Sequence, residues 1–427
     1  MRYVHRILLD KLEVGFKSNR IIIVVGSRQV GKTTLMNMFR NGIPEDYKSF
    51  YFNLEDINSL DVCQDINKLK AYLSNNSVNI EEQKVFLIID EFQYIDNATK
   101  LFKIFYDLYP NVKILASGSS SIEAQKHLKE SLAGRKRIYN LYPLNFAEFV
   151  RFKSESEFDR YKKLGFLGVS SVFIETYNRD FLKDYLTFGG YPKVALLDNN
   201  IERIEELLDI YNSYVQKDIK SLIKGENISA YNNLLKILSS QVGNLLNVHE
   251  LSNTLRIGRR IVEKYLSILE QTFIIKLLPP FSSNRRTEIV KMPKIYFMDS
   301  GLVNSSLGNF GEFDYRPNIG SITENFVFCE IIKYKPVYYD VKYWRTKNGT
   351  EIDFILSGND ELIPIKVKWK RFTKPVVPKS IVAFFNKYRN TKKAVIVTKA
   401  YCDQIKLQGK YIYFIPAVLL SKFLSKK

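Results

Sequence analysis

Residues 21–34, IIIVVGSRQVGKTT, constrain the fold of this chain more than any other stretch of its sequence. Five β-branched aliphatic residues precede Gly26, which predicts a parallel strand buried on both faces. Gly31, Lys32 and Thr33 then open a helix. The two glycines, with four residues between them, let the backbone turn tightly and present its N–H groups to phosphate oxygens at the helix N-terminus. The stretch therefore predicts a phosphate-binding loop for a nucleotide.

The side chains of this loop have distinct expected roles. Lys32 would reach the β- and γ-phosphates, and Thr33 would place its hydroxyl on Mg²⁺, a hard cation that prefers oxygen ligands. The residues expected to bind the nucleotide are Gly26, Ser27, Arg28, Gln29, Val30, Gly31, Lys32, Thr33 and Thr34. ATP and Mg²⁺ are the predicted cofactors.

A second apolar run, residues 85–91 (VFLIIDE), ends in two acids. Together with Thr33, Asp90 would hold Mg²⁺, and Glu91 would orient the water that attacks the γ-phosphate. A buried strand that ends in a helix-capping aspartate is common, so this run predicts ATP hydrolysis only together with the loop. The next strand, 112–116, ends at Ser117, which would sense the γ-phosphate or align the water, unless it only forms a turn.

The order of these elements predicts the fold class. Strands alternate with helices, and a phosphate-binding loop follows a strand, which indicates a P-loop NTPase with a doubly wound parallel sheet. The 427 residues suggest about three domains, and three scattered cysteines and three isolated histidines give neither a disulfide framework nor zinc spacing. No run approaches 18 apolar residues and no signal-like segment opens the chain, so we expect a cytoplasmic protein without a membrane partner.

Four segments carry a resemblance to a known family: residues 27–35 (SRQVGKTTL), 86–95 (FLIIDEFQYI), 117–121 (SGSSS) and 131–149 (SLAGRKRIYNLYPLNFAEF). They resemble the AAA-type ATPases of bacteria and archaea whose C-terminal domain is catalogued as domain of unknown function 4143. The resemblance implies an arginine that stabilises transition-state charge, often across the boundary between subunits of a homo-oligomer. Arg135 matches that position, with Arg137 as second choice. The expected catalytic residues are thus Lys32, Glu91, Ser117 and Arg135, and the oligomeric state stays open.

The middle of the chain has the spacing of a winged helix-turn-helix. Apolar residues recur at helical spacing from 231 to 242, from 248 to 255 and from 259 to 269, and residues 273–278 predict a strand. The residues expected at the N-terminal end of the recognition helix, where bases and phosphates are contacted, are Arg256, Arg259 and Arg260. A packing lid or a protein dock is the alternative.

The last third resembles a restriction-endonuclease-like α/β domain, with Glu324 on a helix, Asp353 on one strand and Lys368 on the next. In that superfamily a carboxylate lies two residues before the lysine, but this chain has Lys366 there. Strand residues two apart face the same way, so the Lys366 ammonium would lie where a metal ligand should be. Because a cation there repels Mg²⁺, we expect no nuclease activity.

The charge of this region predicts its partner. Residues 331–427 hold 21 Lys and Arg against 6 Asp and Glu, in a chain of net charge +19. This excess indicates a polyanion, unless it is only a solvated lysine-rich surface. We expect DNA or RNA to bind Lys366, Lys368 and a basic, aromatic surface that includes Trp344 and Trp369, without cleavage.

The sequence therefore predicts an ATP-hydrolysing AAA-type protein whose nucleotide state changes how its basic C-terminal region grips nucleic acid. The alternative is a signalling or scaffold ATPase whose C-terminal domains bind protein partners. The predicted domains are an ATPase domain (1–190), a helical lid or connector (191–227), a winged helix-turn-helix (228–284) and a restriction-endonuclease-like domain (285–427).

Overall fold

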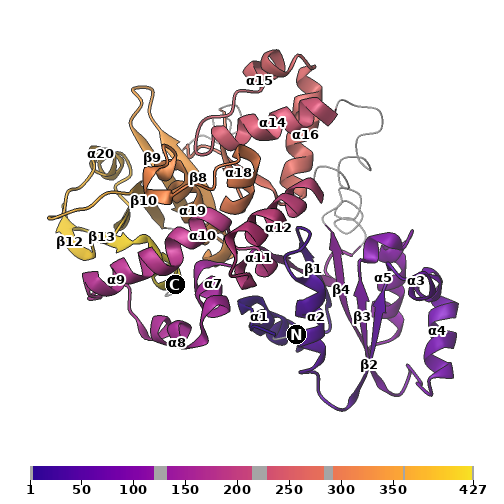
Figure 1. Cartoon of the computed structure of the whole chain (residues 1–427). Coiled ribbons are helices and arrows are strands. Elements are labelled where there is room, and N and C mark those ends of the chain that lie inside the picture. The colour runs from indigo at the N-terminus through magenta and orange to yellow at the C-terminus, as the bar shows by residue number, and fades with distance from the viewer. Residues whose placement is uncertain (1–2, 120–131, 214–227, 283–291, 359–360, 426–427) are drawn as a thin grey trace. The chain divides into compact units, whose positions relative to one another are not determined.

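The computed structural model divides into two compact units (Figure 1). It describes residues 3–119, 132–213, 228–282, 292–358 and 361–425. The first unit comprises Met1–Tyr142 and Gln271–Phe273, and the second comprises Pro143–Glu270 and Ile274–Lys427. The boundaries of the four predicted domains stay a prediction, and the division between the two units falls after Tyr142.

A five-stranded parallel sheet forms the centre of the first unit. Its strand order is β2-β3-β4-β1-β5, and the strands are β1 Ile21–Gly26, β2 Tyr47–Asn53, β3 Lys84–Asp90, β4 Val112–Ser119 and β5 Lys136–Leu141. The predicted parallel sheet is confirmed. Every residue of β1 is buried, because β4 and β5 pair with it on either side and helices cover the faces of the sheet. The edge strand β5 was not among the strands expected from the sequence.

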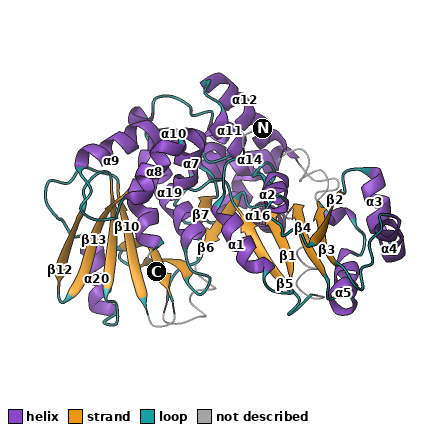
Figure 2. Ribbon diagram, turned by 90° about the horizontal axis from the view of Figure 1, so that it is seen from below, coloured by secondary structure: helices purple, strands orange, loops and turns teal. Residues whose placement is uncertain are grey.

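Helices cover both faces of this sheet (Figure 2). The helices of the first unit are α1 Ile7–Phe16, α2 Lys32–Arg40, α3 Ile57–Gln64, α4 Ile66–Asn75, the 3₁₀ helix η1 Phe92–Tyr94 and α5 Ala98–Leu108. On one face, Phe16 and Phe39 both contact the ring of Phe86 on β3. On the other, residues of α3, α4 and α5 share a core with Val85 and Leu87. The sheet is therefore doubly wound.

The second unit begins with a helical region. Its helices are α7 Phe146–Lys153, α8 Glu155–Lys163, α9 Ser171–Tyr177, the π-helix η2 Asn178–Leu182, α10 Lys183–Phe188, α11 Pro192–Leu196, α12 Asn200–Ser213, α14 Ile228–Ser240, α15 Val248–Leu255 and α16 Arg259–Gln271. Two short strands follow, β6 Ile275–Leu278 and β7 Lys294–Phe297, and they pair antiparallel. Leu245, between α14 and α15, adds a single bridge to Lys294 on β7. The strand expected at residues 273–278 corresponds to β6, and residues 283–291 lie outside the described residues.

A six-stranded mixed sheet completes the second unit. Its order is β12-β13-β11-β10-β9-β8, in which the pairs β10–β11 and β11–β13 are parallel and the others antiparallel. Its elements are α18 Ser300–Leu307, η4 Phe313–Tyr315, α19 Ile319–Tyr334, β8 Asp340–Arg345, β9 Glu351–Ser357, β10 Leu362–Lys368, α20 Lys379–Lys387, β11 Lys393–Thr398, β12 Asp403–Leu407, β13 Lys410–Pro416, η5 Ala417–Leu419 and α21 Leu420–Leu424.

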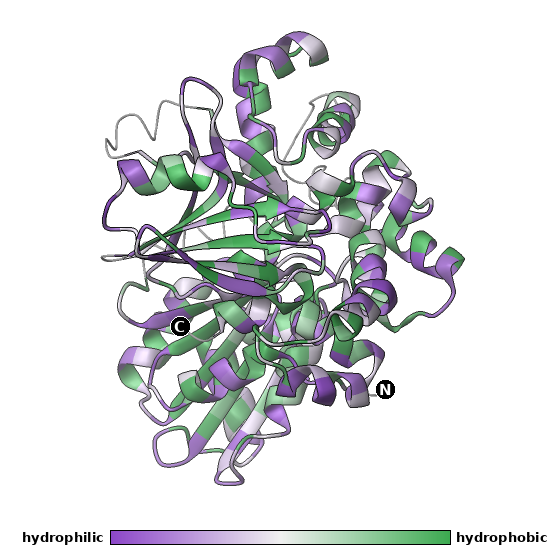
Figure 3. Cartoon of the chain, turned by 90° about the vertical axis from the view of Figure 1, so that its left-hand side faces the viewer, coloured by the Kyte–Doolittle hydropathy of each residue, from purple (hydrophilic) through white to green (hydrophobic). Residues whose placement is uncertain are grey.

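Apolar strand residues form the core of this sheet, and many of its strand segments are green in Figure 3. Trp344 on β8 is 3% exposed and lies edge-on to Phe384 of α20. The expectation that Trp344 belongs to a basic surface was therefore wrong, because its ring fills the space between the sheet and α20. Within the described part of the chain, no helix is both long and apolar enough to cross a membrane.

Candidate nucleotide-binding site

The loop between β1 and α2 has a backbone that only its glycines allow without strain. Gly31 has φ 90° and caps α2, a left-handed conformation that other residues seldom adopt. A Cβ atom on Gly26 would lie 2.3 Å from the carbonyl oxygen of Leu141, because β1 and β5 pair at that position. Gln29 also has a positive φ, of 59°. The loop is thus held in one tight path at the C-terminal end of β1.

Lys32 points its ammonium into this loop. The side chain is 6% exposed, and Nζ donates to the carbonyl oxygens of Gly26 at 3.3 Å and Ser27 at 3.1 Å. Nζ also lies 3.9 Å from Oε1 of Glu91. The Ser27 hydroxyl is buried and has no hydrogen-bond partner among the described residues. A buried cation, the N-terminus of α2 and an unused hydroxyl form a cradle that fits phosphate groups.

Arg6 braces the loop from a distant part of the sequence. This buried residue precedes α1, and its guanidinium donates from Nη1 to the carbonyl of Val30 at 3.0 Å and from Nη2 to that of Tyr142 at 2.8 Å. The sequence reasoning missed this residue. A single arginine at the start of the chain has no motif around it that signals a contact 24 residues away.

Asp90, at the end of β3, accepts hydrogen bonds from three hydroxyls. Thr33 donates to Oδ2 at 2.6 Å, Tyr51 donates to the same oxygen at 2.9 Å, and Ser117 donates to Oδ1. Asp90 is 1% exposed, and no described lysine or arginine forms an ion pair with it. Burial, and next the nearby Asp90 charge, raise the pKa of Tyr51 above its ordinary value, so its hydroxyl stays protonated and donates. Thr33 and Asp90 together offer the oxygen ligands that suit Mg²⁺.

Glu91 follows in a strained conformation beside Asp90. Its φ is 59°, which is uncommon outside glycine and costs of order 1–3 kcal/mol. Its Oε2 accepts from Nε2 of Gln93 at 2.6 Å, and its backbone N–H donates to the Ser117 hydroxyl at 3.4 Å. The structure thus brings five of the predicted site residues together at the C-terminal edge of the sheet: Lys32, Thr33, Asp90, Glu91 and Ser117.

Arg135 lies in a different setting. Its guanidinium pairs with Asp107 of α5 through Nε at 2.7 Å and Nη2 at 3.2 Å. The structure shows no hydrogen bond from its side chain to the described loop residues. Its role as an arginine finger stays a prediction. Of the segments that carried the family resemblance, residues 120, 121 and 131 lie outside the described residues.

Family models match three segments: an AAA domain at residues 18–150, the domain of unknown function DUF8612 at 179–312, and the domain of unknown function DUF4143 at 319–419. The chain therefore carries an AAA-type P-loop ATPase domain followed by the domains DUF8612 and DUF4143. The resemblance inferred from the sequence is thereby confirmed.

Relatives extend over most of the chain. An uncharacterized protein of Methanocaldococcus jannaschii is 28% identical over 382 residues, which cover 84% of this chain and 80% of the relative. One from Haemophilus influenzae is 25% identical over 423 residues, which cover 95% of this chain and 96% of the relative. Among solved structures, the Walker-type ATPase of Pyrococcus abyssi matches with a TM-score of 0.46 and 16% identity over 71% of this chain and 96% of that chain.

The DUF4143 domain contains the second cluster predicted from the sequence. Nζ of Lys366 lies 2.6 Å from Oδ1 of Asp353, and the backbone N–H of Val367 donates to Oδ2 at 2.6 Å. Asp353 is 1% exposed. The Lys366 ammonium therefore forms an ion pair with the Asp353 carboxylate, on the side of β10 that the alternation of strand residues predicted. Lys368, two residues further along β10, is half-buried.

Glu324 of α19 belongs to a network of buried charges beside this pair. Its Oε1 accepts from the Tyr296 hydroxyl at 2.6 Å and lies 3.3 Å from Nζ of Lys294. Lys294 also pairs with Glu351 at 2.6 Å. Burial, and next the charge of Asp353, raise the pKa of Glu324 to about 7. The described residues contain no group of three or more His, Cys, Asp or Glu side chains that could hold a metal ion.

The three arginines predicted at the recognition helix are exposed, Arg256 in the turn after α15 and Arg259 and Arg260 at the start of α16. Arg256 caps α15 with φ 54°, and Arg259 pairs with Glu263 one turn along α16 at 2.9 Å. Arg260 is exposed. The turn therefore presents positive charge to solvent at the N-terminal end of α16.

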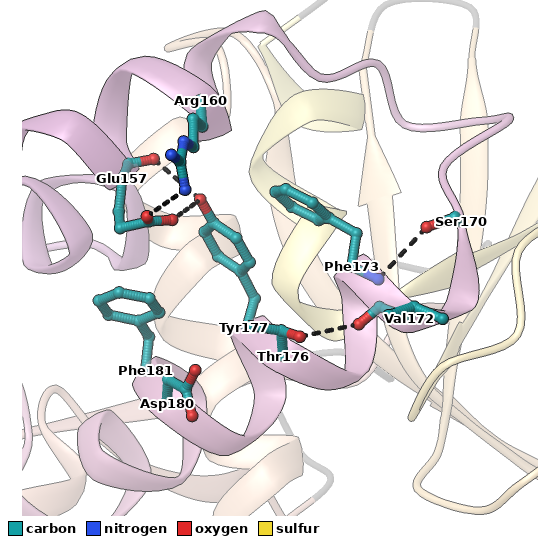
Figure 4. A pocket seen from close by; sticks show the side chains of 9 residues that line it. All are labelled: Glu157, Arg160, Ser170, Val172, Phe173, Thr176, Tyr177, Asp180 and Phe181. Carbon is teal, nitrogen blue, oxygen red and sulfur yellow. Dashed lines mark hydrogen bonds and ion pairs between the residues drawn. The ribbon is translucent and has the colours of Figure 1, made fainter.

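A pocket of about 470 Å³ lies between α8 and α9 in the second unit (Figure 4). Phe173, Tyr177 and Phe181 line it with stacked and tilted rings. Its polar groups bond to one another, because Glu157 accepts from the Tyr177 hydroxyl at 3.0 Å and pairs with Arg160 at 2.8 Å. With those groups already paired, the pocket indicates no ligand class.

Proposed function

We propose that the AAA domain binds and hydrolyses ATP with Mg²⁺, and that its nucleotide state controls how the basic second unit holds nucleic acid without cutting it. The convergence of Lys32, Thr33, Asp90 and Glu91 at one edge of the parallel sheet supports the ATPase part. AAA-domain membership supports it independently.

Each of these residues has a separate role in the proposed hydrolysis. Lys32 and the N–H groups at the start of α2 bind the β- and γ-phosphates, while Thr33 and Asp90 hold the metal. Mg²⁺, when bound, neutralises charge that develops on the phosphate oxygens. Glu91 accepts a hydrogen bond from the attacking water and orients it, which requires the carboxylate to turn from Gln93 toward the γ-phosphate.

Two variants test the ATPase part. Lys32→Ala should lose binding of a fluorescent ATP analogue, because the buried ammonium is removed from the loop. Glu91→Gln should bind ATP like the wild type and hydrolyse it at least about a hundredfold more slowly, because a positioned base contributes roughly 10²–10⁴-fold. Lys68→Ala, which removes an exposed lysine from the same domain, is the control. Folded wild-type protein that binds no Mg·ATP would overturn the proposal.

Charge and helix arrangement support the nucleic-acid part. Helices α14, α15 and α16 precede the antiparallel pair β6–β7, the element order of a winged helix. In this arrangement Arg256, Arg259 and Arg260 lie at the start of the recognition helix, where phosphates and base edges are contacted. Lys366 forms an ion pair with Asp353, so of the two candidate lysines we expect Lys368 to contact a phosphate. The same ion pair supports the absence of nuclease activity, because it places an ammonium where Mg²⁺ would have to bind.

Salt dependence tests this part. Binding of a DNA or RNA duplex by full-length protein should weaken steeply with ionic strength, because each phosphate contact releases a counterion. The double variant Arg256→Ala/Arg260→Ala should weaken binding and reduce the salt slope by about 2. The control Arg179→Ala/Lys193→Ala removes the same charge from exposed ion-paired positions. Metal-dependent cutting that Asp353→Ala abolishes would contradict the absence of nuclease activity. No binding at low salt would favour the alternative, a scaffold ATPase that binds protein partners.

A further inference from the structure

Tyr51 contacts the predicted metal site although it belongs to neither motif of the ATPase. It lies on β2 and its hydroxyl is 2.9 Å from Oδ2 of Asp90. Strands β2 and β3 pair so that Asn53 lies opposite Asp90. Side chains two residues apart on a strand share a face, and the long tyrosine side chain reaches Asp90 diagonally from that position.

The contact matters because Asp90 is a buried carboxylate with which no lysine or arginine of the described residues forms an ion pair. Oδ1 accepts from Ser117, and Oδ2 accepts from Thr33 at 2.6 Å as well as from Tyr51. In the proposed function the Thr33 hydroxyl serves as a metal ligand. Asp90 would then keep two donors, Ser117 on one oxygen and Tyr51 on the other. Two hydrogen bonds on different oxygens fix the rotation of a carboxylate, whereas one leaves it free to turn.

We infer that Tyr51 is a positioning residue whose hydroxyl holds Asp90 in the orientation that receives Mg²⁺ beside Thr33. This inference rests on the proposed ATPase function. Side chains that orient a metal ligand usually change metal affinity by about 10- to 100-fold when they are removed. The expected result of losing the Tyr51 hydroxyl is therefore a metal-specific defect, with nucleotide binding in the absence of metal preserved.

The chain supplies a matched control on the same strand. Tyr47 lies four residues before Tyr51, so both side chains share a face of β2. Its ring contacts Phe16, and its hydroxyl forms no hydrogen bond in the described part of the chain. Tyr47→Phe and Tyr51→Phe thus remove the same atom from one strand, and only the second removes a bond to Asp90.

The experiment titrates Mg²⁺ into full-length protein with a fluorescent ATP analogue, and repeats the nucleotide titration in EDTA. Tyr51→Phe should need at least about tenfold more Mg²⁺ for half-maximal binding, and its affinity in EDTA should equal that of the wild type. Tyr47→Phe should match the wild type in both titrations. Thermal melting of each variant measures folding separately.

Two results would overturn the inference. In the first, Tyr51→Phe has the wild-type Mg²⁺ requirement. In the second, Tyr51→Phe loses affinity equally with Mg²⁺ and in EDTA, which would mean that Tyr51 only supports the loop. If wild-type protein binds the nucleotide under neither condition, the proposed ATPase function fails and takes this inference with it.

Discussion

The ion pair between Lys366 and Asp353 allows a quantitative test of the DUF4143 domain. The Lys366 side chain is 15% exposed and that of Asp353 is 2% exposed, so the pair is shielded from water. Removing one partner of a buried pair costs about 3–5 kcal/mol, because the other charge is left buried and unpaired. In a Lys366→Met variant Asp353 keeps the N–H of Val367, and position 366 is not fully closed to solvent, since the Lys366 side chain is 15% exposed. We therefore expect Lys366→Met to destabilise the domain by about 2–4 kcal/mol.

The double variant separates loss of the pair from loss of packing. Replacing both partners of a buried pair by apolar residues is often close to neutral, so Lys366→Met/Asp353→Leu should recover most of the lost stability. The coupling energy of the cycle should be at least about 1.5 kcal/mol. The matched control is Lys393→Met, because Lys393 pairs with Glu361 at 2.8 Å in the same sheet but both side chains are about a quarter exposed. It should cost less than about 1 kcal/mol.

The assay is urea unfolding followed by tryptophan fluorescence. The chain has two tryptophans, Trp344 and Trp369, and both lie in the DUF4143 domain, so the signal reports this domain without interference from the AAA domain. A Lys366→Met variant within about 0.5 kcal/mol of the wild type would refute the reasoning. It would mean that the buried carboxylate is compensated without the lysine.

Three further predictions concern other positions. Burial chiefly raises the pKa of Glu324 to about 7, so between pH 4.5 and 7 the folded protein binds a proton there that the unfolded chain has lost. The free energy of unfolding should therefore fall by up to about 3 kcal/mol as the pH rises from 4.5 to 7. Glu324→Gln should flatten this part of a urea-unfolding series, and an unchanged pH profile would contradict the shift. Arg135→Ala should lower the ATPase rate roughly 10³-fold if Arg135 acts as a finger, whereas Asp107→Ala, which only frees that arginine, should retain activity. Equal rates for wild type and Arg135→Ala would remove it from that role. Gly26→Ala should abolish ATP binding and lower the melting temperature, because its Cβ would lie 2.3 Å from the Leu141 carbonyl oxygen, and wild-type binding by this variant would show that the loop can shift.

The sequence predicted those features whose backbone requirements are local. A phosphate-binding loop needs glycines at fixed spacing between a buried strand and a helix, so its residues could be placed without knowledge of the fold. The acids at the end of β3 were predictable for the same reason, because an apolar run marks the strand and the acids mark its end. Lys366 could be assigned to the Asp353 site because strand alternation is a local rule.

The sequence did not predict features that depend on pairing between distant segments. Strand β5, KRIYNL, forms a sheet edge and has no continuous apolar run or strict alternation, so its pattern does not mark it as a strand. Tyr51 and Arg6 reach the site through contacts 39 and 24 residues away in the chain. Trp344 was misplaced because basic neighbours suggested a surface, whereas a strand residue beside a charged one, here Arg345, can still face the core.

Pairing within the DUF4143 domain also bears on what the basic C-terminal region can bind. Among its described residues, Glu351, Asp353 and Glu361 each form an ion pair with a lysine or arginine. Each ion pair uses one cation as well as one carboxylate, and because Lys and Arg outnumber Asp and Glu by 21 to 6 in residues 331–427, the region keeps a net positive charge. A surface of this kind attracts any polyanion, including an acidic protein. A nucleic acid differs in its dense and regular charge, and the steep salt slope expected from counterion release is what separates it from an acidic protein partner.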